Sequence, residues 1–261
     1  MQEWSQYAEK LAFFINPQTF PVAVTFLDDE SGIPPSAKRP LDKFQVPMAP
    51  CQGASMARRY GWTVGFGPRD VGCAIAAHTH GWKKVTHEAA AADSFVRLAY
   101  AKDEEAARTI VNEFRCLDPN PDRAVVYAPL ARVKLEPDVV LIYVNPAQLM
   151  RLIHGITYHT GHPIGGSFSG RASSCTEGVV AAYLDNTFKV VVPGNGDRVW
   201  AACQDHEMVM ALPAPKFPVV IEGLEKSHQR GIRYPIPTFM KYRPEVAFSM
   251  PLSDIFDPQP Q

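Results

Sequence analysis

The stretch Asp138-Val139-Val140-Leu141-Ile142-Tyr143-Val144 is the strongest strand signal in the sequence. After the leading aspartate its apolar run is unbroken, whereas a strand with one face in water alternates apolar and polar residues. The run therefore predicts a central strand that is buried on both faces of a sheet. Asn145-Pro146 follows directly and predicts the start of a helix, because proline suits the first helical turn.

Predicted helices and strands alternate along the rest of the chain. Apolar residues at helical spacing predict helices at 2–15, from 51 to about 61, one or two between 87 and 114, and 218–227. Apolar and β-branched runs predict strands at 20–27, 62–66, 123–133, 187–192, 197–202 and 207–212. We therefore expect a mixed α/β fold, with a central mixed sheet, flanking helices and antiparallel hairpins in the C-terminal part.

The 261 residues are expected to form one domain, 1–261. Within it, a strand, a helix and then Cys73 resemble a later strand, helix and Cys175. This echo suggests two related halves, 1–135 and 136–230, with Cys73 and Cys175 facing each other across a local two-fold axis. A proline-rich tail, 231–261, follows.

Composition excludes several classes of partner. The formal net charge of −1 offers no electrostatic basis for binding nucleic acid or an anionic membrane surface. No apolar run is long enough to span a bilayer, and the N-terminus lacks the features of a secretory signal. Five widely spaced cysteines do not resemble a disulfide framework. We expect a cytoplasmic protein with reduced cysteines, and the sequence leaves a homo-oligomer open.

Three of the cysteines occupy similar places in the sequence. Cys73 follows Gly67-Pro68-Arg69-Asp70, in which Asp70 is the expected N-cap of a short helix. Cys175 follows a serine cap at the start of an Ala/Val-rich helix, and Cys51 opens a third helix. Backbone N–H groups and the helix dipole stabilise a thiolate at such positions. We therefore expect Cys51, Cys73 and Cys175 to converge on one metal or redox site, although each also suits a small buried core position.

The order of these motifs resembles one family. It runs through the strand 21–24, the three cysteine helices, the strand 138–144 with its Asn-Pro start, Asp197-Arg198 and the segment 205–208. Together they resemble the prokaryotic family called domain of unknown function 169, over nearly the whole chain. The resemblance implies no established reaction. Some members carry a further cysteine near Pro193 or Gly194, which this chain lacks, so the fourth thiolate of those members has no match at that position.

Three dispersed cysteines suit an iron–sulfur cluster, expected to be of the cubane 4Fe-4S type, with one iron open for substrate. Cys116 and Cys203 are candidate fourth ligands. Zinc is the alternative cofactor, with imidazole ligands from the histidines at the following positions: His78, His80, His154, His159 and His162. A third reading makes Cys175 a nucleophile, with Glu177 and Arg171 beside it as catalytic residues.

The expected function is therefore an iron–sulfur protein that performs redox or Lewis-acid chemistry on a small molecule. An iron–sulfur oxidoreductase or lyase is favoured, and its partner is a small-molecule substrate or a redox protein. The alternatives are a zinc- or thiolate-dependent enzyme, or a non-catalytic metal-binding subunit. Two local features receive structural explanations: the segment 194–198 is expected to be a hairpin turn, and Arg198, Asp205 and Glu207 a buried salt-bridge network.

Overall fold

A six-stranded sheet forms the centre of the computed structural model, which describes residues 2–166 and 168–236. The strands are β1 (Val22–Leu27), β2 (Val64–Phe66), β3 (Ala124–Pro129), β4 (Val139–Val144), β5 (Lys189–Val191) and β6 (Met208–Pro213). Their order in the sheet is β2-β3-β1-β4-β6-β5, and every pair of neighbours is antiparallel. The mixed α/β class is confirmed, while the sheet itself is antiparallel instead of mixed.

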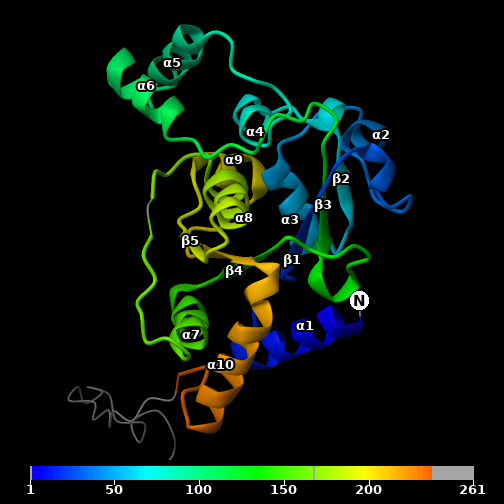
Figure 1. The fold of residues 1–261 in the computed structure, drawn as a ribbon, viewed down its shortest axis with the longest axis vertical. Helices are drawn as coiled ribbons and strands as arrows, with labels where there is room; N and C mark the ends of the chain where they lie inside the picture. Colours follow the sequence, from blue (N-terminus) through cyan, green and yellow to red (C-terminus); the bar gives the residue numbers. More distant parts are fainter. Residues whose placement is uncertain (1, 167, 237–261) are drawn as a thin grey trace, which may run out of the picture.

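The strand predicted to be central lies in the middle of the sheet. β4 pairs with β1 on one side and with β6 on the other, and all six of its residues are buried. Helices cover both faces, which is why this strand carries no alternating polar residues (Figure 1).

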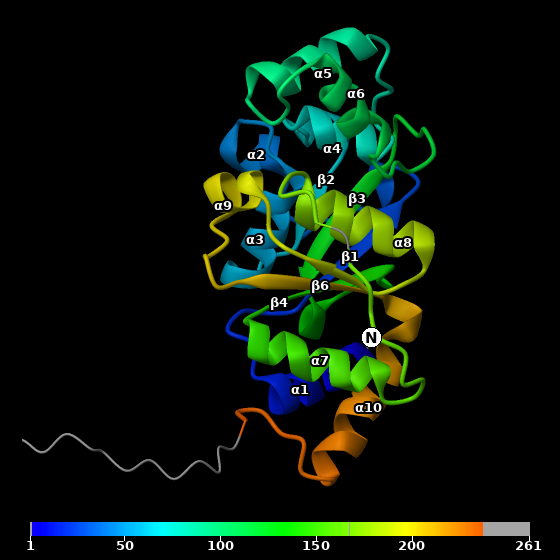
Figure 2. The same cartoon turned by 90° about the vertical axis from the view of Figure 1, so that its left-hand side faces the viewer.

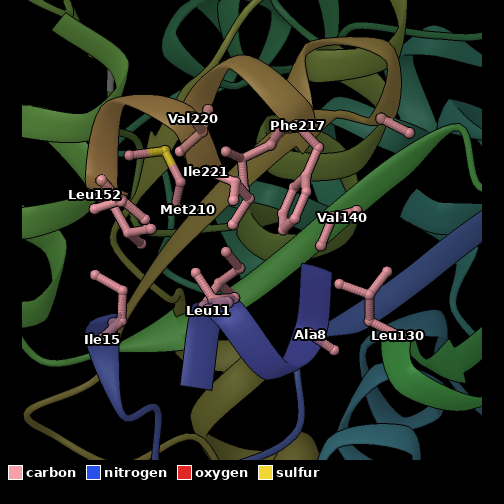
Figure 3. Packing of buried hydrophobic residues seen from close by; sticks show 14 of the residues in the cluster. Ala8, Leu11, Ile15, Leu130, Val140, Leu152, Met210, Phe217, Val220 and Ile221 are labelled. Carbon is pink, nitrogen blue, oxygen red and sulfur yellow. The ribbon is translucent and has the colours of Figure 1, made fainter. Parts of the chain in front are cut away.

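One face of the sheet is covered by three helices, α1 (Gln2–Ile15), α7 (Pro146–Thr157) and α10 (Phe217–Gln229). Leu11 of α1, Leu152 of α7 and Phe217 of α10 are fully buried against this face (Figure 3). Burying side chains of this size stabilises the fold by about 1.5–3 kcal/mol each. This layer holds the larger apolar core and none of the five cysteines.

The other face carries the helices that hold two of the three predicted cysteines. They are α3 (Pro50–Tyr60), a π-helix (Ser173–Val180) that continues into α8 (Ala181–Asp185), and α9 (Asn195–Ala201). Beyond this layer, α2 (Pro40–Phe44), α4 (Ala74–Thr79), α5 (Glu88–Arg97) and α6 (Glu104–Asn112) lie toward one end of the molecule (Figure 2). α5 and α6 pack on each other around a small core of their own.

The two halves of the sheet pair in the same register. Val22 of β1 lies opposite Pro129 of β3, just as Val139 of β4 lies opposite Pro213 of β6. Each of these β3 and β6 prolines is followed by one 3-10 turn. The outer pairs, β2 with β3 and β5 with β6, also match position for position.

The central pair, β1 with β4, is arranged as a local two-fold axis requires. Ala23 lies opposite Val140 at its centre, and Val22–Leu141 is the counterpart of Val24–Val139. The axis is perpendicular to the sheet, because matching residues of the two halves face the same side of the sheet. The strands therefore follow a local two-fold arrangement, of the kind expected for two halves.

One predicted strand is wrong. The segment 197–202 lies mainly in the helix α9, not in a strand. Gly194 is the N-cap of this helix, and its N–H donates to the carboxylate of Asp197 at 3.1 Å, so the segment 194–198 is a helix start instead of a hairpin turn. Most of the predicted tail, 237–261, lies outside the described residues.

Candidate functional site

Cys51, Cys73 and Cys175 line one cavity of about 620 Å³. The structure therefore brings together three cysteines that are 22 and 102 residues apart in the sequence. They come from three different elements: α3, the residue before α4, and the π-helix. All five cysteines are free thiols.

Cys51 lies in the first turn of α3, as predicted. Pro50 occupies the first helical position, and the Gln52 side chain accepts a hydrogen bond from the N–H of Ala49 at 2.8 Å. Burial raises the pKa of the Cys51 thiol strongly, while the N–H groups of Gln52 and Cys51 act in the opposite direction. Burial outweighs the helix start, so this thiol is neutral at pH 7.

Cys73 is itself the N-cap residue of α4. The predicted N-cap, Asp70, instead ends a separate 3-10 turn and is buried. Its carboxylate accepts hydrogen bonds from the N–H of Gly67 and from Arg39, both at 2.9 Å. Asp70 therefore holds the loop that precedes Cys73 and does not cap the helix that follows it.

Cys175 lies at the third position of the π-helix Ser173–Val180. Its N-cap is Ala172, not a serine, with φ of +50° in the left-handed region that a residue with a Cβ rarely adopts. The Cys175 thiol is buried, lies 3.7 Å from the hydroxyl of Thr176, and has a pKa raised by burial. Strained backbone and π-helical turns both concentrate at functional sites.

Cys51, and not Cys73 as predicted, is the counterpart of Cys175 in the matching halves. Gly53 lies against Phe66 and Tyr127, and Gly178 lies against the equivalent strand positions. The cysteine precedes its glycine by two residues in α3 and by three in the π-helix. The wider π-helical turn accommodates the additional residue.

Asp197 is a cavity residue that sequence reasoning did not place at the site. It is buried, and it accepts hydrogen bonds from the hydroxyl and N–H of Ser174 and from the N–H of Gly194. The Gly-x-x-Asp spacing that joins Gly194 to Asp197 also joins Gly67 to Asp70. That repeated spacing was the sequence signal for this residue.

Tyr127 lies on β3 and packs against α3, the helix that carries Cys51. Its ring packs 3.2 Å from the position that a Cβ on Gly53 would take. The side chain is fully buried, and its hydroxyl has no hydrogen-bond partner among the described residues. Burial raises the pKa of this hydroxyl well above its usual value, and Cys175 and Cys51 raise it further.

Cys116 and Cys203, the candidate fourth ligands, do not line the cavity. The Cys116 sulfur lies 3.4 Å from Nε2 of His78, which does line it. Burial and then Glu207 raise the pKa of Cys203 to about 12. Of the two, Cys116 is therefore connected to the cavity, through His78.

The remaining zinc candidates lie elsewhere. His80 is fully buried, stacks on Trp82 with a centroid separation of 5.1 Å, and has its pKa lowered to about 4 by burial. His154, His159 and His162 do not line the cysteine cavity. Within residues 2–166 and 168–236, no three His, Cys, Asp or Glu side chains form a group that could hold a metal ion.

The predicted catalytic pair, Arg171 and Glu177, lines a second cavity of about 790 Å³ and not the cysteine cavity. Glu177 accepts a hydrogen bond from the Ser169 hydroxyl, and burial raises the pKa of Glu177. Although Glu177 is only two residues from Cys175, the structure does not bring the two into the same cavity.

The predicted buried salt-bridge network of Arg198, Asp205 and Glu207 does not form as one cluster. Glu207 pairs with Arg58 at 2.5 and 2.9 Å, and the Arg58 guanidinium lies 3.9 Å from the centre of the Tyr143 ring. Arg198 contacts the exposed Asp205 at 3.7 Å instead. Arg58 therefore anchors α3 to the loop before β6 and is unavailable to a substrate.

The fold and the cavity define an α/β protein with an antiparallel sheet and a cysteine-lined cavity beside the helices on one face. The chain belongs to the family domain of unknown function 169, described as uncharacterised ArCR, whose profile matches residues 10–223. An uncharacterized protein of Methanocaldococcus jannaschii, MJ0308, is 33% identical over 135 residues. That match covers 52% of this chain and 58% of the relative, so it spans less than two thirds of that protein.

No solved structure matches the chain significantly. Across the part of the chain that the structure describes, every helix is too short or too polar to cross a membrane.

Proposed function

We propose that this protein binds an iron–sulfur cluster of the 4Fe-4S type through Cys51, Cys73 and Cys175. The observation that supports this most is that three cysteines from separate elements line one cavity. Iron–sulfur clusters take thiolate ligands, and a cubane cluster carries each ligand on a different iron. The three sulfur atoms therefore need not meet at a single point, as they would around one metal ion.

Burial favours a metal centre over a free thiol nucleophile. It raises the pKa values of Cys51 and Cys175, which keeps both thiols protonated at neutral pH. A nucleophile must be a thiolate, whereas a bound metal displaces the thiol protons itself. The arrangement therefore suits ligands better than an unassisted catalytic cysteine.

With three protein thiolates, one iron would lack a protein sulfur ligand and could act on a small molecule in the cavity. This supports an oxidoreductase or lyase, with a small-molecule substrate or a redox protein as partner. A reduced, cytoplasmic location in a prokaryote fits the free thiols and the archaeal relative.

Zinc is the second candidate, because His78 lines the same cavity as Cys73 and provides an imidazole. A zinc site or a purely structural metal would use the same cysteines without redox chemistry. Metal content separates these alternatives directly.

The test is to purify the protein without oxygen, reconstitute it with ferrous iron and sulfide, and measure iron, sulfide and zinc together with the visible spectrum. We expect about four irons and four sulfides per chain, and loss of both when Cys51, Cys73 and Cys175 are all replaced by serine. The control is the double variant Cys116→Ser/Cys203→Ser, which should keep the cluster. Stoichiometric zinc that excludes iron, or equal iron in both variants, would contradict the proposal.

A further inference from the structure

One wall of the cysteine cavity is mainly apolar, with Ser94 and Tyr100 as its polar residues. The α5–α6 pair contributes Phe95 and Val111 to it, and the segments that follow these helices contribute Leu98 and Phe114. Trp200 of α9 lies at the same cavity and is 64% exposed. A volume of about 620 Å³ is in the range of sites that take small organic molecules.

No lysine or arginine lines the cavity, and His78 is the one basic side chain among its lining residues. Its carboxylate, Asp197, already accepts hydrogen bonds from Ser174 and Gly194. The neighbouring cavity differs, because Arg115, Arg171 and Lys189 line it. A phosphate or carboxylate ligand would therefore be disfavoured beside the cysteines, where it would meet Asp197 without a compensating lysine or arginine.

Two polar groups of the cavity lining lack a hydrogen-bond partner among the described residues, Nδ1 of His78 and the hydroxyl of Ser173, and the second lies at the cysteine end. Ser173 lines the cavity and its side chain is only 1% exposed. Its hydroxyl makes no hydrogen bond of normal geometry among the described residues, although it lies close enough to the Glu177 carboxylate to lower the pKa of that group. Leaving such a group unpaired costs about 1–3 kcal/mol, so a ligand that completes its hydrogen bond gains affinity. Ser173 is two residues before Cys175, which places this group beside the candidate metal ligands.

We propose that the cysteine cavity takes an uncharged, largely apolar small molecule that makes one hydrogen bond to the Ser173 hydroxyl. The inference rests on the proposed function, since it names the substrate class of the same site. The apolar wall from α5, α6 and α9 receives the body of the molecule. Its single polar atom then lies next to Cys175.

Two aromatic probes that differ by one charge test this on metal-free protein. N-phenyl-1-naphthylamine is uncharged and carries one N–H donor, and 8-anilinonaphthalene-1-sulfonate is the same skeleton with a sulfonate. We expect saturable fluorescence enhancement at one site per chain, with the uncharged probe binding at least tenfold more tightly. Ser173→Ala should weaken the uncharged probe several-fold, about the effect of one hydrogen bond.

A charge placed at the cavity mouth provides the second arm. Leu98 is 66% exposed, so Leu98→Glu should fold normally and reduce binding of the uncharged probe more than tenfold. Val219→Glu is the matched control, because Val219 is an exposed apolar residue of α10 that does not line the cavity. Circular dichroism checks that each variant is folded.

Equal affinity for the two probes, or unchanged affinity in folded Leu98→Glu or Ser173→Ala protein, would overturn the inference. Because the probes are measured without metal, this failure is distinct from failure of the iron–sulfur proposal, which metal content decides.

Discussion

Gly53 and Gly178 occupy equivalent positions over the two halves of the sheet, but only Gly53 is tightly enclosed. A Cβ on Gly53 would lie 2.4 Å from Cε2 of the buried Phe66 ring. A Cβ on Gly178 would meet Val191 at 3.4 Å, an ordinary contact. The half that carries Cys51 is therefore packed more closely on the strands than the half that carries Cys175.

Gly53→Ala is expected to destabilise the protein by about 1–3 kcal/mol, because Phe66 is buried and cannot move aside freely. Gly178→Ala is the matched control and should change the free energy of unfolding by less than about 1 kcal/mol. Urea unfolding followed by circular dichroism measures both. Equal destabilisation by the two substitutions would mean that Gly53 is no more closely enclosed than Gly178.

Cys175→Ser is expected to abolish cluster binding, because a hydroxyl is a poor ligand for iron in such a cluster. Cys203→Ser serves as the control, since Cys203 is also buried but does not line the cavity. Both variants should lose about 1–3 kcal/mol of stability from a buried hydroxyl, so stability does not distinguish them. Iron and sulfide content does, and an intact cluster in Cys175→Ser protein would remove this cysteine from the site.

Tyr127→Phe is expected to stabilise the metal-free protein by about 1 kcal/mol. The substitution removes a fully buried hydroxyl that has no hydrogen-bond partner among the described residues, and it leaves the ring in place. Tyr143→Phe is the control, because the Tyr143 hydroxyl is not among the buried unpaired groups of the described residues and its loss should not stabilise the protein. Chemical unfolding of both variants gives the comparison, and destabilised Tyr127→Phe protein would mean that the hydroxyl has a partner.

Glu207→Gln is expected to destabilise the protein by about 3 kcal/mol at pH 7, because it leaves the Arg58 guanidinium buried without its carboxylate. Burial alone would raise the pKa of Glu207, but hydrogen bonds from Arg58 and the N–H of Gln204 lower it below the usual 4.5. The Glu207 carboxylate therefore stabilises the fold at pH values above 4.5, the usual pKa of the group. Its contribution is lost as the pH falls through the lower pKa that Glu207 has in the folded protein.

The stability gap between wild type and Glu207→Gln should consequently shrink as the pH is lowered below about 4.5. Urea unfolding at pH 7 and at successively lower pH measures this gap. A gap that stays constant across the range would show that the carboxylate is not ionised in the folded protein. The surface pair Lys10–Glu225 provides a comparison, and Glu225→Gln should cost less than about 1 kcal/mol.

The sequence alone located most elements, because periodicity is a local property. The run 138–144 predicted a central buried strand, and β4 is that strand. The Asn145-Pro146 start predicted α7, and Gly61 correctly ended the helix that Cys51 opens. Each of these features depends on a few neighbouring residues, which carry the same preferences in any fold.

The segment 194–202 shows where local reasoning failed. Its two glycines suit a hairpin turn, whereas in the structure hydrogen bonds to Asp197 hold the start of a helix there. Two of those bonds come from Ser174, which is 23 residues away. The spacing of apolar residues along a segment carries no information about a hydrogen bond to a residue so far away in the sequence.

The sequence by itself determined which cysteines occupy the starts of helices, and it selected the three that line the cavity. Only the tertiary structure decided that they share that cavity, that Cys51 is the counterpart of Cys175, and that Glu177 faces elsewhere. The reason is that the strand register sets these relationships, and residues more than a hundred positions apart establish that register. A one-residue change in it would turn every side chain of a strand to the opposite face.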